Sequence, residues 1–329
     1  MTAIILVNWN GADDTIACLR SLRKAAGDFI VVIADNASDD DSLQRIGAFI
    51  KENGEEERFF LLPLDNNYGF AVGNNKALGF AMRFSPDSYM LLNNDTEVEP
   101  DFLTRLMAFS AVNPQYRALT PRINYFDDKN VIWECGGDIK TGRRVVKYAN
   151  MDAKDLDYII CANVVNVLDG VGYFPITSIS GCALFFYPEL LDADGNLFTD
   201  RYFFGEEDFE FSMRMKKKGL RMACVPGSCI YHKVGRSRNK MKAIANVGKY
   251  YMYYLNRLIT LRLHLSPWKF RLVKMMYMPN CFRYFYSVNH AFKTSWSLMA
   301  RLSREVESKY GVSREDFRAL MIDNDYFEK

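Results

Sequence analysis

The residues best suited to chemistry are Asn93, Asn94 and Asp95, which directly follow the apolar run from Tyr89 to Leu92. Pro100 can open a helix soon afterwards, so this run is predicted to be a buried strand that ends in polar side chains. In an open α/β sheet, ligands bind in the crevice beyond the carboxyl ends of the strands. Asp95 is therefore a candidate for chemistry, although Asn-Asn-Asp-Thr is also ordinary turn composition.

Two earlier apolar runs end in the same way. The first is followed by Asn8 and Trp9, and the second by Asp35. Each could be an ordinary strand-end turn, but together they offer side chains suited to a sugar nucleotide at one edge of a sheet. No Gly-x-Gly-x-x-Gly sequence follows the first run, which disfavours a dinucleotide dehydrogenase.

A second acidic cluster, Glu206 to Asp208, follows Gly205 and begins a segment that becomes rich in lysine and ends at Gly219. This pattern predicts a helix with acids in its first turn and cations in its last, and dipole complementarity alone could explain those acids. His232 lies 24 residues after Asp208. An intervening helix and an antiparallel strand could return the chain to the same edge.

Two further features are weaker candidates for contacts with a substrate. Trp133 could stack on a sugar ring, although a Trp between Ile and Glu is more often simply packed. The small residues Ser180 and Gly181 precede an apolar run, and such a turn could let a substrate approach the backbone closely.

The elements that must position these residues alternate in type. Four apolar runs of strand length are each followed by a segment with helical spacing of apolar residues, which predicts a doubly wound, mostly parallel sheet. The runs are Ala3 to Val7, Phe29 to Ala34, Arg58 to Leu62 and Tyr89 to Leu92. Later strands are predicted at Arg117 to Ile123, Tyr158 to Val171, Ile179 to Phe186 and Leu220 to Val225.

Composition indicates a globular protein with an uneven charge distribution. The 329 residues are 49% hydrophobic, and the seven scattered cysteines form no Cys-x-x-Cys pair, which argues against a zinc site and fits a reducing cytoplasm. The amino terminus reads as a strand and not as a signal peptide, and no window is apolar enough to span a membrane. Between Lys233 and Arg304 lie 15 of the 42 basic residues, many aromatic residues and no acid. This segment suggests an anionic membrane surface, with nucleic acid as the weaker alternative.

The ordered set of motifs resembles the inverting family 2 glycosyltransferases with the GT-A fold, and most closely their rhamnosyltransferase-like branch. The resemblance covers about Thr2 to His232. It rests on Val7-Asn8-Trp9-Asn10, Asp35-Asn36-Ala37-Ser38, Asn67-Tyr68-Gly69-Phe70-Ala71 with Asn74-Asn75, Leu92-Asn93-Asn94-Asp95-Thr96, Ser180-Gly181, Glu207-Asp208 and His232. It implies a Rossmann-like central sheet flanked by helices in residues 1–235, with a basic, mainly helical region in residues 236–329.

The resemblance also implies roles for the candidate residues. Asp95 and His232 would bind Mg²⁺ or Mn²⁺, Asp208 would be the catalytic base, and Glu207 would orient the acceptor. The donor nucleotide sugar would contact Asn8, Trp9, Asp35, Asn67, Gly69, Asn93 and Asn94, with Asp35 at the pyrimidine, and the acceptor would contact Trp133, Ser180 and Gly181. Asn93 replaces the first Asp of the family's metal motif, so the metal would depend more on the diphosphate and water.

The predicted activity is transfer of a sugar, with rhamnose as one candidate, from a nucleotide diphosphate donor to a saccharide or polyprenyl-linked acceptor in surface polysaccharide synthesis. The enzyme would be peripheral at the cytoplasmic face of the cell membrane and would not bind nucleic acid. The alternative is a peripheral membrane protein that binds saccharide without turnover. A nucleotidyltransferase is less favoured, because no Gly-rich, Lys-containing phosphate loop lies near the first strand.

Overall fold

The structure is a computed structural model that describes residues 1–163, 172–234, 246–323 and 326–327. Its first third alternates strands and helices, as the spacing of apolar residues predicts. The elements are β1 (Thr2–Asn8), α1 (Ala12–Leu22), β2 (Phe29–Asp35), α2 (Ser42–Glu52), β3 (Phe59–Pro63), α3 (Gly69–Ala81), a 3₁₀ turn (Met82–Phe84) and β4 (Ser88–Leu92).

The middle of the chain adds further strands to the sheet, three more helices, and a separate hairpin, β8–β9. These elements are β5 (Thr96–Val98), α4 (Phe102–Val112), β6 (Tyr116–Tyr125), β7 (Ile132–Glu134), β8 (Gly137–Lys140), β9 (Arg143–Val146), α5 (Ala153–Asn163), β10 (Phe174–Ile176), β11 (Ala183–Phe186), a 3₁₀ turn (Pro188–Leu190), α6 (Glu207–Lys217) and β12 (Arg221–His232). The carboxyl-terminal part is helical: α8 (Asn246–His264), α9 (Pro267–Asn289), α10 (Phe292–Ser308) and α11 (Arg314–Met321).

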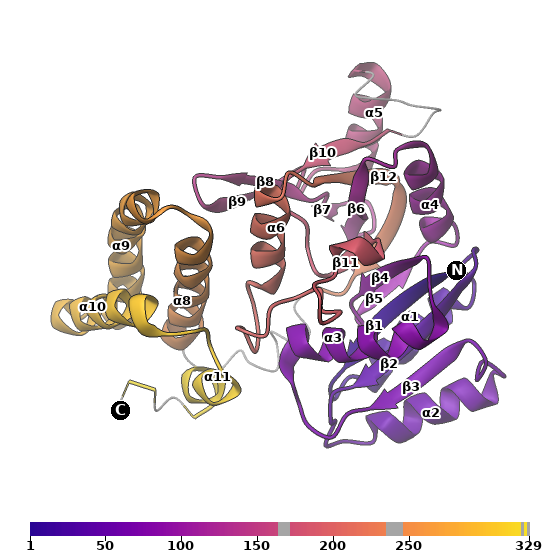
Figure 1. Cartoon of the computed structure of the whole chain (residues 1–329), viewed down its shortest axis with the longest axis horizontal. Coiled ribbons are helices and arrows are strands. Elements are labelled where there is room, and N and C mark those ends of the chain that lie inside the picture. The colour runs from indigo at the N-terminus through magenta and orange to yellow at the C-terminus, as the bar shows by residue number, and fades with distance from the viewer. Residues whose placement is uncertain (164–171, 235–245, 324–325, 328–329) are drawn as a thin grey trace.

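The strands form one sheet in the order β10-β12-β6-β11-β4-β1-β2-β3, with β5 and β7 paired beside β12 and β6 (Figure 1). The neighbours β4, β1, β2 and β3 are parallel, whereas β11 runs antiparallel between β4 and β6. The predicted α/β class with a mostly parallel central sheet and helices at the carboxyl end is therefore confirmed.

Alternate residues of the central strands fill two cores. Ile4 and Ile33 contribute to the core under α1, α2 and α4, while Ile5 and Val32 contribute to the core under α3. All four side chains are fully buried. Because successive strand residues point to opposite faces, a strand covered on both sides must be apolar throughout, which explains the unbroken apolar runs in the sequence.

Three local predictions need correction. Tyr158 to Asn163 is the end of helix α5 and not a strand, and the rest of that predicted strand, residues 164–171, lies outside the described residues. The strand predicted to end at Val225 continues, through a register shift, to His232. Pro100 precedes α4 by two residues instead of opening it. The domain boundary predicted at residue 235 also falls outside the described residues.

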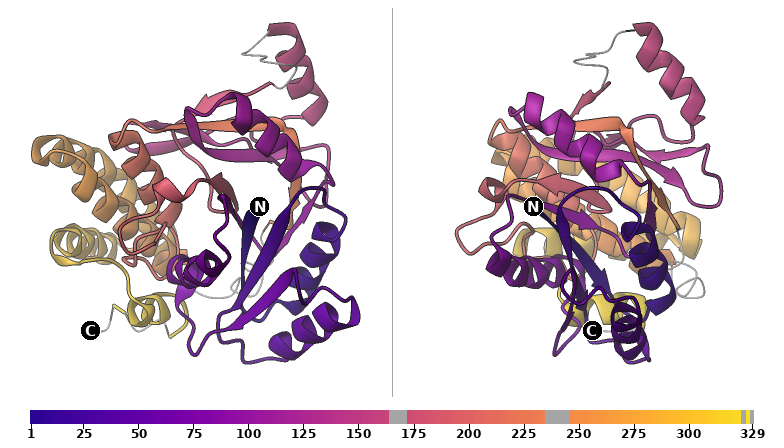
Figure 2. Two further views of the ribbon diagram at one scale, coloured as in Figure 1. Left: turned by 45° about the vertical axis from the view of Figure 1, so that its right-hand side comes forward. Right: turned by 90° about the vertical axis from the view of Figure 1, so that its right-hand side faces the viewer.

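The carboxyl-terminal helices share a third core with residues of the sheet domain (Figures 1 and 2). Leu258 and Leu302 of the helices are buried in the same cluster as Phe209 and Met213 of α6. Across the described ranges, no helix has the length and apolar character needed to cross a membrane. The six cysteines in that part of the chain whose side chains are described are buried, and none forms a disulfide.

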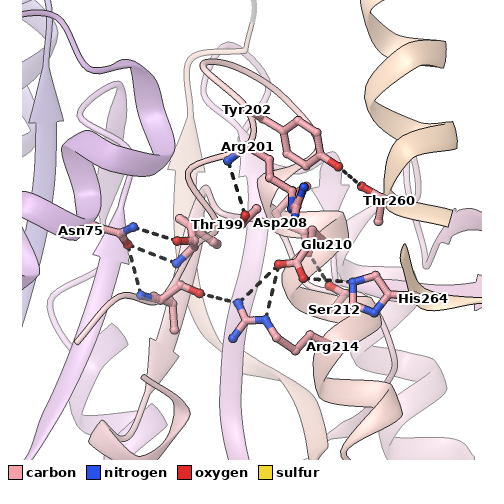
Figure 3. Close-up of polar contacts among 12 residues, drawn as sticks. Asn75, Thr199, Arg201, Tyr202, Asp208, Glu210, Ser212, Arg214, Thr260 and His264 are labelled. Atoms are coloured by element: carbon pink, nitrogen blue, oxygen red, sulfur yellow. Dashed lines mark hydrogen bonds and ion pairs between the residues drawn. The ribbon is translucent and has the colours of Figure 1, made fainter. Parts of the chain in front are cut away.

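Polar contacts continue the link between α6 and α8 (Figure 3). Glu210 of α6 contacts His264 of α8, with 3.0 Å between Oε1 and Nε2, and the Tyr202 and Thr260 hydroxyls are 2.6 Å apart. Burial opposes ionisation of Glu210, but His264 and Arg214 outweigh it and lower the pKa of Glu210. The charged network therefore holds α6 against α8.

Candidate functional site

The carboxyl ends of β1 and β2 carry a connected set of polar side chains. Asn8 is fully buried, and its Nδ2 donates to Asp35 Oδ1 at 2.8 Å. Ser38 donates to both Asp35 oxygens, through its hydroxyl at 2.7 Å and its backbone N–H at 3.0 Å. Each carboxylate oxygen accepts about two hydrogen bonds, so Asp35 Oδ2 retains capacity for one further donor. Trp9, beside this network, is 54% exposed.

Asn94 joins this network from β4. Its Nδ2 donates to Thr15 Oγ1 at 2.8 Å, and Thr15 in turn donates to Asn8 Oδ1 at 2.8 Å. Three separate strand ends and the start of α1 are thereby fixed relative to one another. Parallel strands place their carboxyl ends on the same edge, which is why residues so distant in the sequence meet here.

Asn67 and Gly69 organise the start of α3. Asn67 Oδ1 accepts hydrogen bonds from Asn36 Nδ2 at 3.0 Å and from the Gly69 N–H at 2.9 Å. Gly69 has φ +75°, and a Cβ there would lie 2.0 Å from the Phe203 carbonyl oxygen. Only glycine suits this close approach of two backbones.

Asp95 and His232 lie together because β12 pairs antiparallel with β5, opposing His232 to Thr96. His232 Nε2 is 3.1 Å from Asp95 Oδ1. Burial opposes the charged imidazolium, but contacts with Cys182 and Asp95 outweigh it and raise the pKa of His232 to about 11. Burial also raises the pKa of the Cys182 thiol, so near pH 7 that thiol is neutral and Asp95 supplies the favourable charge.

The atoms at this point fit a divalent cation. Asn93 Oδ1 and His232 Nδ1 are buried and have no hydrogen-bond partner in the described part of the chain, and the only charged partner of buried Asp95 Oδ1 in that part is His232. Unpaired buried polar atoms are costly and are typical of a site that a ligand completes. In the described ranges, no three His, Cys, Asp or Glu side chains are arranged so that they alone could hold a metal ion. A hard ion that takes its remaining ligands from phosphate and water would bind here in place of the imidazolium proton, because histidine ligates a metal only as the neutral imidazole.

The Ser180-Gly181 turn connects this edge to α6. Asn93 N–H donates to the Cys182 carbonyl at 2.8 Å, and Gly181 N–H donates to Asp208 Oδ2 at 3.3 Å. Asp208 therefore lies one short turn away from Asn93 and Asp95. A Cβ on Gly181 would meet the Phe70 ring at 3.1 Å, so an aromatic ring occupies the space beside this glycine.

Asp208 also has one partner, Arg144, that the sequence did not reveal. Arg144 of β9 donates from Nη1 to Asp208 Oδ2 at 3.0 Å, and its Nη2 pairs with Glu134 of β7. Glu134 is buried, and burial raises its pKa even though Arg144 opposes the shift. A signal was present in the sequence, since Glu134 is the only acid in the otherwise apolar run from Val131 to Cys135. Nothing in the sequence identified Arg144 as its partner.

Glu207 and Trp133 lie beside these groups. Burial, reinforced by the Asp208 charge, raises the pKa of Glu207 to about 8, so this carboxyl is mostly protonated at neutral pH. Its buried Oε2 has no hydrogen-bond partner among the described residues. Trp133 is half-buried, and its ring meets the edge of the His232 ring with 4.6 Å between centroids. Trp133 thus packs on the imidazole.

Comparisons with known proteins bear on the family and the fold. Residues 3–165 match the family model described as Glycosyl transferase family 2. A mannosyltransferase from Pyrobaculum calidifontis, solved with GDP-Man and Mn²⁺, has 15% identity and a TM-score of 0.51, covering 92% of this chain and 75% of that chain. Residues 1–349 of TarS from S. aureus have 13% identity and a TM-score of 0.52, covering 99% of this chain and 91% of that chain.

A third structure, GalNAc-T7 with UDP, GalNAc and Mn²⁺, has 13% identity and a TM-score of 0.58, and covers all of this chain and 57% of that chain. A comparison with curated protein sequences gave no match. At these identities the solved structures establish a shared fold.

Proposed function

We propose that the chain is a glycosyltransferase that uses a nucleotide sugar as donor and catalyses inverting transfer to an acceptor hydroxyl. The match of residues 3–165 to the Glycosyl transferase family 2 model, together with the shared fold, supports this proposal. The observation that carries the proposal is the placement of Asp208 one turn away from the Asp95–His232 pair, through Gly181 and Asn93. That arrangement offers a leaving-group site and a base at one edge of the sheet.

The donor nucleotide would lie along the ends of β1, β2 and β4. Asp35 Oδ2 is available for an N–H of the base, and Asn67 and Gly69 would contact the donor from the start of α3. Asp95 and His232 would hold Mg²⁺ or Mn²⁺, which when bound neutralises charge that develops on the departing nucleotide diphosphate. Rhamnose from a deoxythymidine diphosphate donor is the first sugar to test.

Asp208 would accept the proton of the acceptor hydroxyl while that oxygen attacks the anomeric carbon. As the new carbon–oxygen bond forms, the bond to the diphosphate breaks and the nucleotide diphosphate leaves with the electron pair. Arg144 and the Gly181 N–H both engage Asp208 Oδ2, which leaves Oδ1 for the acceptor. The protonated Glu207 can hydrogen-bond a second acceptor atom.

A panel of nucleotide sugars tests this activity. We expect release of free nucleotide diphosphate from one donor in the presence of Mn²⁺ or Mg²⁺, measured with a saccharide or lipid extract as acceptor source. Excess chelator should stop release, and Asp95→Asn should weaken the response to metal. Full activity in chelator would contradict the metal role. No release from any donor, together with saccharide binding, would favour the non-catalytic alternative.

We further propose that the protein attaches to the inner face of the cell membrane through exposed side chains of α9 and α10, called here the α9–α10 face. These side chains are Trp268, Leu272, Met275, Met276, Phe292 and Trp296, which are 48–63% exposed. They lie within the acid-free segment from Lys233 to Arg304. Aromatic side chains inserted at the lipid interface with cations above them are typical of peripheral membrane attachment.

Vesicle sedimentation tests the α9–α10 face. The protein should bind vesicles that contain anionic lipid, and less so at high salt, because each nearby Lys or Arg contributes on the order of 1 kcal/mol. Replacing Trp268 and Trp296 by Ser should weaken binding at least about tenfold, since each buried aromatic contributes about 1.5–3 kcal/mol. Tyr158→Ser is the control, because Tyr158 is 73% exposed on the remote helix α5. Vesicle binding that depends neither on anionic lipid nor on salt would contradict membrane attachment through the α9–α10 face.

A further inference from the structure

A cavity of about 570 Å³ lies between the β8–β9 hairpin and the helices α8 and α9. Ten residues line it, of which four are arginines and four are tyrosines, and none is acidic. The hairpin and α9 are tied together at this point, because Tyr277 donates from its hydroxyl to the Gly142 carbonyl at 2.9 Å. The cavity is therefore built by elements from both parts of the chain.

The four guanidinium groups divide into two pairs. Arg144 and Arg257 are already neutralised, Arg144 by Glu134 and Asp208 and Arg257 by Glu206. Arg143 and Arg283 have exposed side chains, and within the described ranges neither forms an ion pair. The cavity thus presents two uncompensated positive charges. Guanidinium groups recognise phosphate and carboxylate through paired hydrogen bonds.

The tyrosines favour a saccharide ligand. Tyr253 is 40% exposed, and Tyr254 and Tyr284 are half-buried at the cavity wall. A tyrosine ring offers a flat apolar face and a hydroxyl at its tip. This combination matches the apolar face and hydroxyl rim of a sugar ring. A ligand with both a sugar ring and an anionic group therefore complements the cavity.

The cavity is connected to the candidate base through Arg144. Arg144 lines the cavity and donates to Asp208 Oδ2 at 3.0 Å. Arg257 lines the same cavity and pairs with Glu206, which precedes Asp208 by two residues. A ligand in the cavity is consequently separated from Asp208 by a single guanidinium group. That position suits the acceptor, whose hydroxyl must reach the base.

We propose that Arg143 and Arg283 bind a phosphate or carboxylate group of the acceptor saccharide, so that the enzyme selects an anionic acceptor. This assignment rests on the proposed glycosyltransferase function. A phosphate could belong to a soluble saccharide or to a lipid-linked one. Both sources offer the same chemistry to the two arginines.

Calorimetric binding of inorganic pyrophosphate, at fixed ionic strength and in chelator, tests the site. The chelator prevents metal-bridged binding at Asp95 and His232. We expect the double variant Arg143→Gln, Arg283→Gln to bind at least about tenfold more weakly, because each hydrogen bond to a charged group contributes enough for such a change. Arg304→Gln, an exposed arginine on α10 outside the cavity, is the matched control and should change binding less than twofold.

Binding to vesicles that contain phosphatidic acid distinguishes a soluble anionic acceptor from a lipid-linked phosphate. Loss of pyrophosphate binding alone supports a soluble anionic acceptor, and loss of both pyrophosphate and vesicle binding supports a lipid-linked phosphate. Unchanged pyrophosphate affinity in the double variant overturns the proposal, as does an equal loss in Arg304→Gln. Donor-dependent nucleotide release is measured in parallel. If the double variant releases nucleotide and binds pyrophosphate with unchanged affinity, only the cavity assignment is overturned. If the wild-type protein releases no nucleotide from any donor, the proposed function itself is overturned.

Discussion

Asp208→Asn should reduce kcat for sugar transfer by about 10²–10⁴, the usual contribution of a general base. The amide keeps the size of the side chain and can still contact Arg144, but it cannot take a proton from the acceptor hydroxyl. Binding of the donor nucleotide should change little, because Asp95 and His232 are untouched. Steady-state transfer rates and calorimetric nucleotide binding measure the two effects separately.

The control for this variant is Asp155→Asn, which removes an exposed carboxylate on α5 far from the site and should leave kcat unaltered. Glu207→Gln distinguishes the two neighbouring acids. If Asp208→Asn retains wild-type kcat while Glu207→Gln loses it, the base is Glu207, whose pKa of about 8 also suits proton transfer near neutral pH.

Glu206→Gln should lower the free energy of unfolding by about 3–5 kcal/mol, which is typical when one member of a buried ion pair is removed. Glu206 and Arg257 are only 9% and 5% exposed, and Arg257 Nη2 donates to Glu206 Oε1 at 2.9 Å. Without the carboxylate, Arg257 would remain charged and buried, because a guanidinium does not lose its proton in proteins. Denaturant unfolding monitored by circular dichroism measures the loss.

Arg257→Met should be less damaging, and its effect should depend on pH. Burial raises the pKa of Glu206, and Arg257 opposes that shift in the wild-type protein. Without Arg257, the folded-state pKa of Glu206 rises further above its unfolded value. The folded variant then gains a proton as pH falls, so Arg257→Met should lose less stability at pH 5.5 than at pH 8.

The exposed ion pair Arg105–Asp101 is the control for the effects of Glu206→Gln and Arg257→Met on the free energy of unfolding. Its side chains are about half exposed, so Asp101→Asn should change the free energy of unfolding by less than about 1 kcal/mol. An equal effect of Asp101→Asn and Glu206→Gln would show that burial of the Glu206–Arg257 pair does not govern its contribution.

The sequence was sufficient for the central sheet because its signals are local. Continuous apolar runs, polar strand ends and helical spacing between them predict the β1 to β4 alternation with boundaries that differ by only a few residues. The strand predicted from Tyr158 was wrong because it also rested on local signals alone. Short apolar runs fit a strand or a buried helix equally well, and only the surroundings of α5 decide between them.

Contacts between distant segments were less accessible. The sequence suggested that Asp208 and His232 return to one edge, but the pairing of His232 with Thr96 depends on the register of β12 against β5. Arg144 could not be assigned, because its partners Glu134 and Asp208 come from different elements and no periodic pattern connects them. The arginine- and tyrosine-lined cavity is likewise a product of how the helices pack on the hairpin.

The close backbone contacts around Phe203 bear on how this enzyme can be altered. Phe203 N–H donates to the Val312 carbonyl at 2.9 Å, and the Phe203 carbonyl accepts from Phe70 N–H at 3.1 Å, beside Gly69. Main-chain hydrogen bonds through Phe203 therefore connect the segment before α11 to the start of α3. The sheet domain and the carboxyl-terminal helices therefore cannot be exchanged independently of each other. Grafting the carboxyl-terminal helices of another protein onto this sheet domain would require matching the backbone at Phe203, whatever side chains were chosen.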